Sequence, residues 1–214
     1  MNSKTLVAYL KEQHAEEATF LDRIKIAYRP YLCPFDDILE AIPEKSSVFD
    51  VGCGSGMLLS LIGKFRNPIK LAGCEITEHL IENAKEVLSD FENKTLFVFN
   101  GDELPNEIMD FDIITMIDVL HHIPKEKQYS FLENLVQKMK LGSTLIFKDI
   151  RGESILSYWN KFHDLLLAGE IGNELKTNDV KHFFVDKLTL KLVKSNNRRM
   201  LLYPHFTLIL KKVK

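Results

Sequence analysis

The chain has 214 residues, a length that suits one large domain or one domain with an added lid. Apolar residues make up 45% and charged residues 27% of the chain, and the formal net charge is −2. This is the composition of an ordinary globular protein: no basic excess points to nucleic acid, and no acidic run predicts a disordered tail.

Cysteine usage and the first residues bear on the cellular compartment. Cys33, Cys53 and Cys74 show no CxxC spacing, which argues against a disulfide framework and a structural zinc site. They are expected to be small buried side chains in a reducing compartment. The N-terminal stretch MNSKTLVAYLKEQHAEE has charges inside any apolar run, so we expect neither a signal peptide nor a membrane span, and a cytoplasmic location.

The predicted elements begin with a helix over residues 5–28 and a short helix over 36–42, separated by a segment with two prolines. Strands and helices then alternate, which predicts a parallel, doubly wound sheet with helices on both faces. The predicted strands are 47–52, 70–76, 95–102, 112–119 and 143–150, and the predicted helices are 56–65, 77–91 and 125–140.

The C-terminal part of the chain follows a different pattern. Residues 186–195 are predicted to be a helix, and residues 198–212 two strands separated by Tyr203-Pro204-His205, an antiparallel hairpin at the sheet edge. Residues 151–184 are too many for a simple crossover, so we predict a helical insertion over the site. The fold class is therefore α/β, a Rossmann-like sheet of seven strands, mostly parallel, with a helical lid.

Three glycines follow the first predicted strand of this sheet, in the stretch SVFDVGCGSGMLL. Glycine allows a tight strand-to-helix turn and a close approach of a ligand to the backbone. Gly52 and Gly54 fit the dinucleotide pattern G-x-G-x-x-G, but Met57 stands at its third position and Gly56 comes one residue early. The pattern D-x-G-x-G-x-G, which begins at Asp50, instead favours a ligand with a small polar, cationic middle.

The stretch VFDVGCGSG resembles the first motif of class I S-adenosylmethionine-dependent methyltransferases, and the resemblance runs from about Ile38 to the C-terminus. LAGCEIT supplies an acidic residue at the end of the second strand, FVFNGDELP one after the third, and IITMIDVLHHIP resembles the end of the fourth. The resemblance implies that residues 1–37 are a helical lid segment and residues 38–214 the methyltransferase domain. It also implies that S-adenosylmethionine is the cofactor and S-adenosylhomocysteine the product.

The resemblance assigns cofactor contacts residue by residue. The backbone at Gly52, Cys53 and Gly54 leaves room for the methionine part of S-adenosylmethionine, and Asp50 lies near the amino group of that part. Glu75 accepts hydrogen bonds from the ribose hydroxyls, and Ile76 packs on the adenine. The remaining contacts are to the adenine edge and the sulfonium region, and they are assigned to Gly101, Asp102, Glu103, Ile117 and Asp118.

The two histidines after the fourth strand are candidates for a catalytic base, which is needed only if the nucleophile must lose a proton. His121 or His122 could take that proton; alternatively, one packs against the cofactor and the other caps the following turn. Asp118 and Asp149 end the fourth and fifth strands, but Ile150 follows Asp149 and the sequence shows no third ligand, so we predict no metal.

Two aromatic segments are candidates for substrate contacts. In SYWNKFHDLL, Tyr158, Trp159 and His163 could wall an apolar pocket and offer a base, or the stretch is an amphipathic helix with a core stripe. Before the first strand, the stretch AYRPYLCPF offers lid candidates that could equally be surface residues; they are Tyr28, Arg29 and Tyr31.

The end of the fourth strand also bears on the substrate. DVLHH lacks the [D/N]-P-P-[Y/F] motif of many methyltransferases that act on planar amines, and it resembles enzymes that methylate oxygen or carbon of small molecules. We therefore expect a small apolar or aromatic substrate, no nucleic acid, and peripheral membrane contact assisted by residues 1–27. The alternatives are N-methylation of a small amine or sugar, and a non-catalytic protein that binds S-adenosylmethionine. The oligomeric state stays open.

Overall fold

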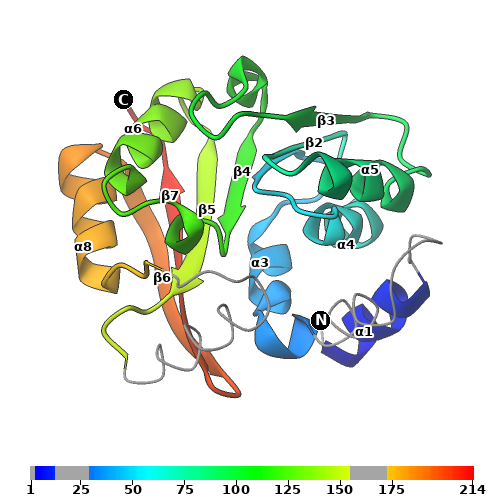
Figure 1. Ribbon diagram of the computed structural model, residues 1–214, viewed down its shortest axis with the longest axis horizontal. Coiled ribbons are helices and arrows are strands. Elements are labelled where there is room, and N and C mark those ends of the chain that lie inside the picture. The colour runs from blue at the N-terminus through cyan, green and yellow to red at the C-terminus, as the bar shows by residue number, and fades with distance from the viewer. Residues whose placement is uncertain (1–2, 13–28, 155–172) are drawn as a thin grey trace. The chain divides into compact units, whose positions relative to one another are not determined.

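The computed structural model describes residues 3–12, 29–154 and 173–214, and Figure 1 shows their arrangement. Within these residues, seven strands form one sheet in the order β3-β2-β1-β4-β5-β7-β6. The sheet is parallel except at β7, which pairs antiparallel with both β5 and β6. The predicted fold class is therefore confirmed. The chain divides into two compact units, Met1–Pro105 and Asn106–Lys214, which are described in turn.

The first unit contains the predicted alternation of strands and helices. Its strands β1 and β2 pair in parallel, and β2 pairs in parallel with β3. Every residue of β1 is buried, as expected for a strand covered on both faces. In chain order the elements are α1 (Ser3–Glu12), α3 (Phe35–Ala41), β1 (Ser47–Val51), α4 (Met57–Arg66), β2 (Lys70–Glu75), α5 (Glu78–Val87) and β3 (Lys94–Val98).

Helix α1 packs against α4 in this unit. Leu6, Val7 and Leu10 of α1 are buried. The Tyr9 hydroxyl lies 3.0 Å from the hydroxyl of Ser60, and both residues belong to helices of this unit. The apolar side chains of α1 are therefore used inside the protein and do not form a free face. The rest of the helix predicted over 5–28 lies outside the described residues after Glu12.

The second unit holds the other half of the sheet. Strands β4 and β5 pair in parallel, and all of β4 is buried. In chain order the elements are η1 (Asn106–Asp110), β4 (Ile113–Ile117), η2 (Leu120–His122), α6 (Gln128–Lys138), β5 (Thr144–Ile150), α8 (Thr177–His182), the π-helix η3 (Phe183–Lys187), β6 (Lys191–Met200) and β7 (Tyr203–Lys211). Of the predicted insertion, residues 155–172 lie outside the described part of the chain.

Two predictions for the C-terminal part are wrong. The helix predicted over 186–195 is wrong beyond Lys187: the π-helix η3 ends there, and Lys191 to Ser195 belong to β6. The helical residues of this region come earlier, in α8 and η3.

The second error concerns the turn of the hairpin. The turn is Leu201-Leu202, and the predicted turn residues 203–205 belong to β7. Pro204 is tolerated in the strand because its carbonyl accepts a hydrogen bond from the Arg151 backbone N–H at 2.8 Å, and that bond needs no N–H from proline.

None of the described helices has the length and apolar character needed to cross a lipid bilayer.

Candidate functional site

The glycine turn after β1 has two kinds of glycine. Gly54 has φ 52°, and a Cβ built on it would meet nothing within 4 Å, so its missing side chain leaves open space over the backbone. Gly56 has φ 79°, and a Cβ there would lie 3.0 Å from the Cβ of Ala84 in α5. Gly56 therefore serves the packing of the turn on α5, and Gly54 leaves room for a ligand.

Glu75, at the end of β2, lies against this turn. One carboxylate oxygen accepts a hydrogen bond from the Gly54 N–H at 3.2 Å. The other oxygen accepts from the backbone N–H groups of Ile76 at 2.8 Å and Thr77 at 3.2 Å. The structure thus brings together Gly54 and Glu75, which the sequence assigned to one ligand. The carboxylate is held at the strand end with part of its surface open to solvent.

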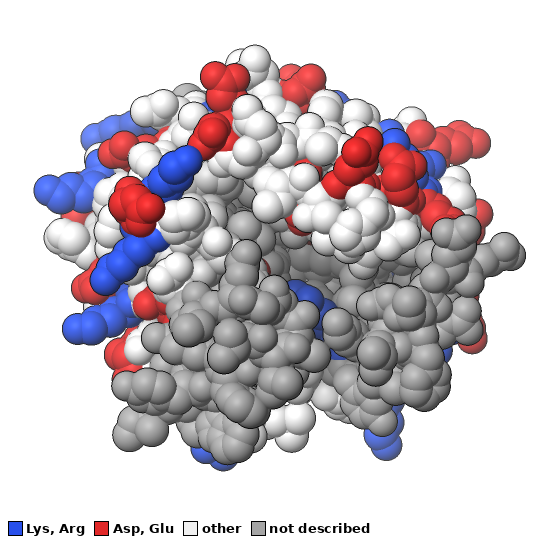
Figure 2. All heavy atoms as spheres, in the orientation of Figure 1, with Lys and Arg blue, Asp and Glu red and all other residues white. Residues whose placement is uncertain are grey.

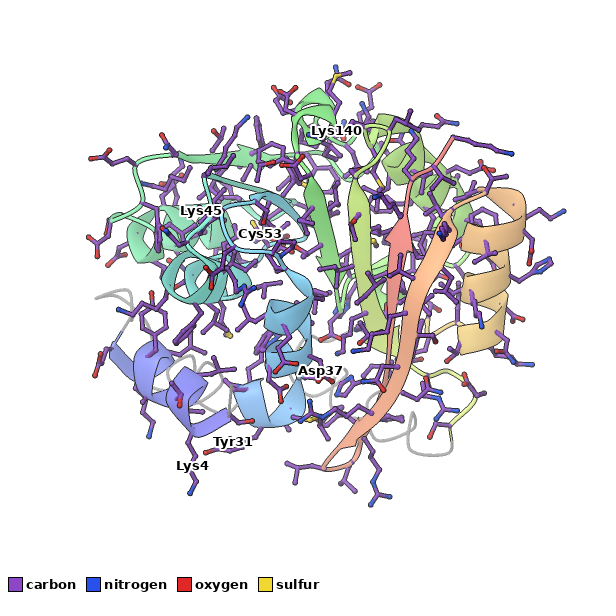
Figure 3. The ribbon with its side chains drawn as sticks, turned by 180° about the vertical axis from the view of Figure 1, so that it is seen from behind. Lys4, Tyr31, Asp37, Lys45, Cys53 and Lys140 are labelled. Atoms are coloured by element: carbon purple, nitrogen blue, oxygen red, sulfur yellow. The ribbon has the colours of Figure 1, made fainter. Side chains whose placement is uncertain are left out.

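Two carboxylates, those of Asp50 and Glu75, lie close enough to this turn to affect its thiol groups. Burial, and after it the charge of Asp50, raises the pKa of the Cys53 thiol well above its usual range, with Glu75 adding to the effect. Burial also raises the pKa of the Cys74 thiol to about 12. Both thiols are therefore neutral near pH 7 and are not activated nucleophiles. Carboxylates next to open backbone suit a cationic ligand. Figure 3 labels Cys53 in the turn.

The segment after β3 forms a tight polar turn. The Asn100 side-chain oxygen accepts hydrogen bonds from the backbone N–H of Asp102 at 3.0 Å and of Glu103 at 3.1 Å. Gly101 has φ 88°, and a Cβ there would lie 3.8 Å from the side chain of Ile76. Ile76 is 59% exposed, a large apolar side chain available to a ligand. The structure therefore brings Ile76 and Gly101 together and adds Asn100 as the residue that shapes the turn, while their contacts with an adenine stay predictions.

In the second unit, Asp118 follows β4 with φ 57°, a conformation that is uncommon for a residue other than glycine. Its carboxylate accepts a hydrogen bond from the ammonium group of Lys148, a fully buried side chain of β5. Its backbone N–H also donates to the Lys148 carbonyl at 2.9 Å. Lys148 therefore fixes Asp118 and balances its charge. Sequence reasoning missed Lys148, although a lysine in the apolar run STLIFKDI was the available signal.

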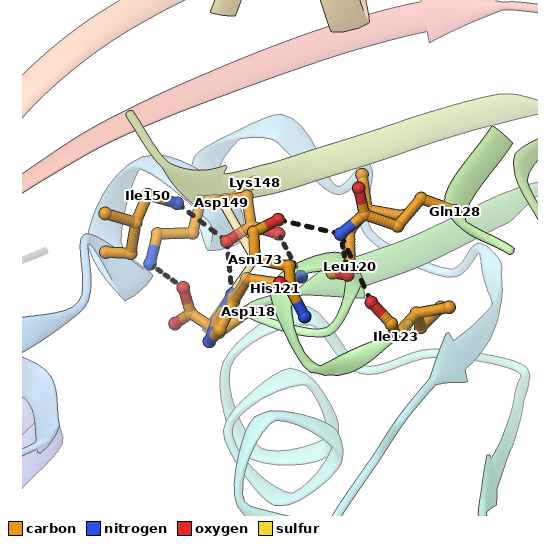
Figure 4. A network of polar contacts seen from close by, with 9 residues as sticks. All are labelled: Asp118, Leu120, His121, Ile123, Gln128, Lys148, Asp149, Ile150 and Asn173. Atoms are coloured by element: carbon orange, nitrogen blue, oxygen red, sulfur yellow. Dashed lines mark hydrogen bonds and ion pairs between the residues drawn. The ribbon is translucent and has the colours of Figure 1, made fainter. Parts of the chain in front are cut away.

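His121 and Asp149 form a buried pair beside this contact, as Figure 4 shows. The His121 Nδ1 lies 2.5 Å from one Asp149 carboxylate oxygen, which also accepts from the Ile150 N–H at 2.7 Å. The other oxygen accepts from the His121 backbone N–H at 3.3 Å. A carboxylate at Nδ1 selects the tautomer with the proton on Nδ1, which makes Nε2 the basic nitrogen of the ring. His122 is exposed, and its ring centroid lies 4.1 Å from that of His121.

Gln128, at the start of α6, holds the short helix η2 that carries both histidines. Its side-chain amide donates to the carbonyls of Leu120 at 2.9 Å, Ile123 at 3.3 Å and Asn173 at 2.7 Å. The Asn173 N–H in turn donates to the His121 carbonyl at 2.8 Å. Gln128 was not singled out from the sequence, because a lone glutamine before a helix carries no distinctive pattern.

Asp118, His121 and Asp149 offer ligand atoms that lie within 4.8 Å of one another, so the third potential metal ligand missed in the sequence is His121. The ammonium group of Lys148 already binds one oxygen of Asp118, and His121 binds Asp149 directly. These contacts account for the group as a network of ion pairs and hydrogen bonds. The absence of a metal stays a prediction.

Several predicted site residues are not tested by this geometry. Tyr28, Tyr158, Trp159 and His163 lie outside the described residues. Arg29 and Tyr31 are described: the Arg29 carbonyl accepts the Cys33 N–H at 2.8 Å, and Tyr31 is among the exposed residues of the first unit. Their lid role stays a prediction, as does the place of Ile117 beside a cofactor.

Comparisons with known proteins agree with this geometry. Residues 49–145 match the family model described as a methyltransferase domain. The chain is 29% identical over 121 residues, 53% of its length and 48% of the relative, to the tRNA N(3)-methylcytidine methyltransferase trm141 of Schizosaccharomyces pombe. It is 30% identical over 104 residues, 48% of its length and 43% of the relative, to a ubiquinone biosynthesis O-methyltransferase of Coxiella burnetii.

A solved structure supports the fold over nearly the whole chain. A SAM-dependent methyltransferase from Aquifex aeolicus has a TM-score of 0.65 and 17% identity, with 97% of this chain and 98% of that chain covered. The chain spans about half or less of the length of the curated relatives it matches.

Proposed function

We propose that this chain, whose residues 49–145 match the family model of a methyltransferase domain, is a class I S-adenosylmethionine-dependent enzyme that methylates an oxygen or carbon of a small apolar or aromatic molecule. The observation that carries the proposal is the buried His121–Asp149 pair, with Nδ1 and the carboxylate 2.5 Å apart. An oriented neutral imidazole can act as a general base. It accepts the proton that a hydroxyl or an acidic C–H of the substrate must lose during methyl transfer.

The residues of the first unit fit S-adenosylmethionine. Open space over Gly54, a carboxylate at the end of β2 and an exposed Ile76 beside Gly101 match the methionine, ribose and adenine parts of that molecule. The carboxylates of Asp50 and Glu75, which add to the effect of burial in raising the pKa of Cys53, suit the positive charge of S-adenosylmethionine. When bound, S-adenosylmethionine supplies a methyl group on a sulfonium, with neutral S-adenosylhomocysteine as the leaving group.

The residues of the second unit handle the proton. The His121 Nε2 accepts the proton that the substrate hydroxyl loses as its oxygen bonds to the methyl carbon. The Asp149 carboxylate stabilises the imidazolium that forms, because it already accepts the Nδ1–H. Lys148, whose side chain is buried, holds Asp118 in place through an ion pair. Because the ammonium group balances its charge, the Asp118 carboxylate repels an electron-rich nucleophile less than an unpaired carboxylate would.

The named relatives divide over substrate class. The Schizosaccharomyces pombe relative carries a tRNA methyltransferase name and the Coxiella burnetii relatives an O-methyltransferase name in ubiquinone biosynthesis. The absence of a [D/N]-P-P-[Y/F] motif in DVLHH favours oxygen or carbon over a planar amine. A cytoplasmic location and a small-molecule partner belong to this proposal. N-methylation of a small amine and a non-catalytic role are its alternatives.

The test is methyl transfer from radiolabelled S-adenosylmethionine to panels of phenols, quinols, small amines and bulk tRNA. We expect transfer to a hydroxylated aromatic compound, and a loss of about 10² to 10⁴ in kcat for His121→Ala. The matched control is His122→Ala, because its ring is exposed and is the direct neighbour of His121. Transfer to tRNA alone, or equal activity of both variants, would contradict the proposal.

A further inference from the structure

The turn of the β6–β7 hairpin exposes two leucines where a turn normally carries small or polar residues. Leu201 is 67% exposed and Leu202 48% exposed. Leu201 has φ 52°, a conformation that glycine adopts without cost and that a leucine does not favour. The turn therefore combines a strained backbone at Leu201 with two exposed apolar side chains. This combination indicates that the leucines contact something other than this chain.

Positive charge accompanies these leucines. Residues 187–214 contain eight Lys or Arg and no Asp or Glu, in a chain whose formal net charge is −2. Two arginines, Arg198 and Arg199, stand directly before Met200 and the turn, and Arg199 is exposed. Elsewhere the charges are mixed: over the surface where α6 and α8 lie, Lys and Arg side chains alternate with Asp and Glu (Figure 2).

We propose that the hairpin turn docks this protein on an anionic membrane surface. Leu201 and Leu202 enter the apolar layer just below the headgroups. Arg199 precedes Leu201 by two residues, which is about 7 Å along the strand. This distance places its guanidinium group among the lipid phosphates. Apolar side chains with basic residues at headgroup depth are the two contributions from which interfacial membrane binding is built.

Other occupants explain these features less well. Nucleic acid would attract the basic residues but offers no apolar phase to Leu201 and Leu202. A second copy of the chain would cover the leucines but would bring a second set of positive charges beside the first. Helix α1 does not offer Leu6 and Leu10 to a membrane, because both side chains are buried in the first unit.

The position of the turn agrees with a role at the site. Strand β7 is antiparallel to both neighbours, so the β6–β7 turn lies beyond the carboxyl end of β5. Ile150 pairs with His205, and Leu202 is three residues further, about 10 Å past that pair. Figures 1 and 3 show the turn at the free end of the hairpin. Docking would turn the strand end that carries Asp149 toward the bilayer, where an apolar substrate dissolves; only this last step rests on the proposed function.

The test is co-sedimentation of the full chain with vesicles of phosphatidylcholine, alone or with about 30% phosphatidylserine. We expect binding to the anionic vesicles and little to the neutral ones. Replacing the turn by Leu201→Gly with Leu202→Asn should weaken binding at least tenfold. The same double variant relieves the positive φ at residue 201, so its thermal stability should not fall and the loss cannot be attributed to unfolding.

Two single variants separate a local from a general charge effect. Arg199→Gln should weaken binding about fivefold. Lys191→Gln is the matched control, because Lys191 lies on the same strand about 33 Å from the turn, beyond the screening length of about 10 Å, and should change binding by less than about twofold.

The proposal is overturned by any of three results: no binding to anionic vesicles, equal binding by the turn variant, or equal losses from Arg199→Gln and Lys191→Gln. Binding to RNA in place of vesicles, insensitive to the turn variant, would assign the charges to nucleic acid. Dimerisation that depends on the leucines, measured by ultracentrifugation and without vesicle binding, would assign them to a second copy. None of these assays uses S-adenosylmethionine, so failure here is distinct from failure of the proposed function.

Discussion

Asp149→Asn is the substitution that most directly tests the order around His121. Three donors converge on this carboxylate: the His121 Nδ1 at 2.5 Å, the Ile150 N–H at 2.7 Å and the His121 backbone N–H at 3.3 Å. Asparagine has one acceptor oxygen. In one orientation of the amide, its NH₂ group faces the backbone N–H of His121. In the other, it faces both the Ile150 N–H and Nδ1, and the imidazole must move its proton to Nε2.

The magnitude follows from these contacts. Hydrogen bonds to a charged acceptor contribute about 1.5 to 3 kcal/mol each, and the asparagine loses one bond and weakens two. We expect the free energy of unfolding, measured by urea denaturation followed by circular dichroism, to fall by about 2 to 3 kcal/mol. We expect nitrogen-detected NMR to show His121 with its proton on Nδ1 in the natural chain and a changed tautomer in the variant.

His122→Ala supplies the comparison, because replacing an exposed side chain usually changes the free energy of unfolding by about 0.5 kcal/mol or less. If Asp149→Asn has the stability of the natural chain and an unchanged His121 tautomer, the carboxylate does not orient the imidazole and the reasoning is refuted.

Three further predictions concern other parts of the chain. Gly54→Ala should cost about 1 kcal/mol through its positive φ and weaken ligand binding, whereas Gly56→Ala should destabilise more because its Cβ meets Ala84 at 3.0 Å; equal costs in denaturation would contradict the division of roles. The buried Cys74 has its pKa raised from 9.0 to about 12, so it stabilises the fold below pH 9 and this stability is lost as pH rises from 9 toward 12; a flat stability profile there would count against its burial. Burial alone would raise the pKa of Glu153, but hydrogen bonds from backbone N–H groups, Arg151 and Thr177 hold it below 4.5. Glu153→Gln should therefore cost about 1 kcal/mol at pH 7, and the difference should narrow as pH falls below 4.5; a difference independent of pH would refute this.

The central part of the fold could be predicted because its pattern is local. Each parallel strand is a short apolar run followed by an amphipathic helix, and this alternation fixes both element type and sheet class. The C-terminal hairpin could not be placed as well. The helix predicted over 186–195 spans two elements in the structure, the end of η3 and the start of β6, and no proline or glycine marks the boundary between them. The turn at Leu201-Leu202 has none of the residues by which turns are recognised.

Residue type and strand end suffice to propose neighbours in the candidate site: Glu75 and Gly54 lie together, and so do Ile76 and Gly101. Their contacts with a cofactor stay predictions. The residues that position others were missed, because their partners are distant in sequence. Lys148 binds a carboxylate thirty residues before it, and Gln128 binds a carbonyl forty-five residues after it. Such pairs come together only once the register of β4 on β5 and the path of the chain beyond residue 172 are fixed.

The central claim is that the first unit binds S-adenosylmethionine through Glu75, and calorimetric titration with S-adenosylmethionine and S-adenosylhomocysteine tests it most directly. Glu75→Gln is the test variant, and Glu78→Gln, an exposed residue at the start of α5, is its control. We predict micromolar binding to the natural chain and to Glu78→Gln, and a loss of at least tenfold in Glu75→Gln. A folded chain that binds neither compound, or that binds both equally well without the Glu75 carboxylate, would contradict the account.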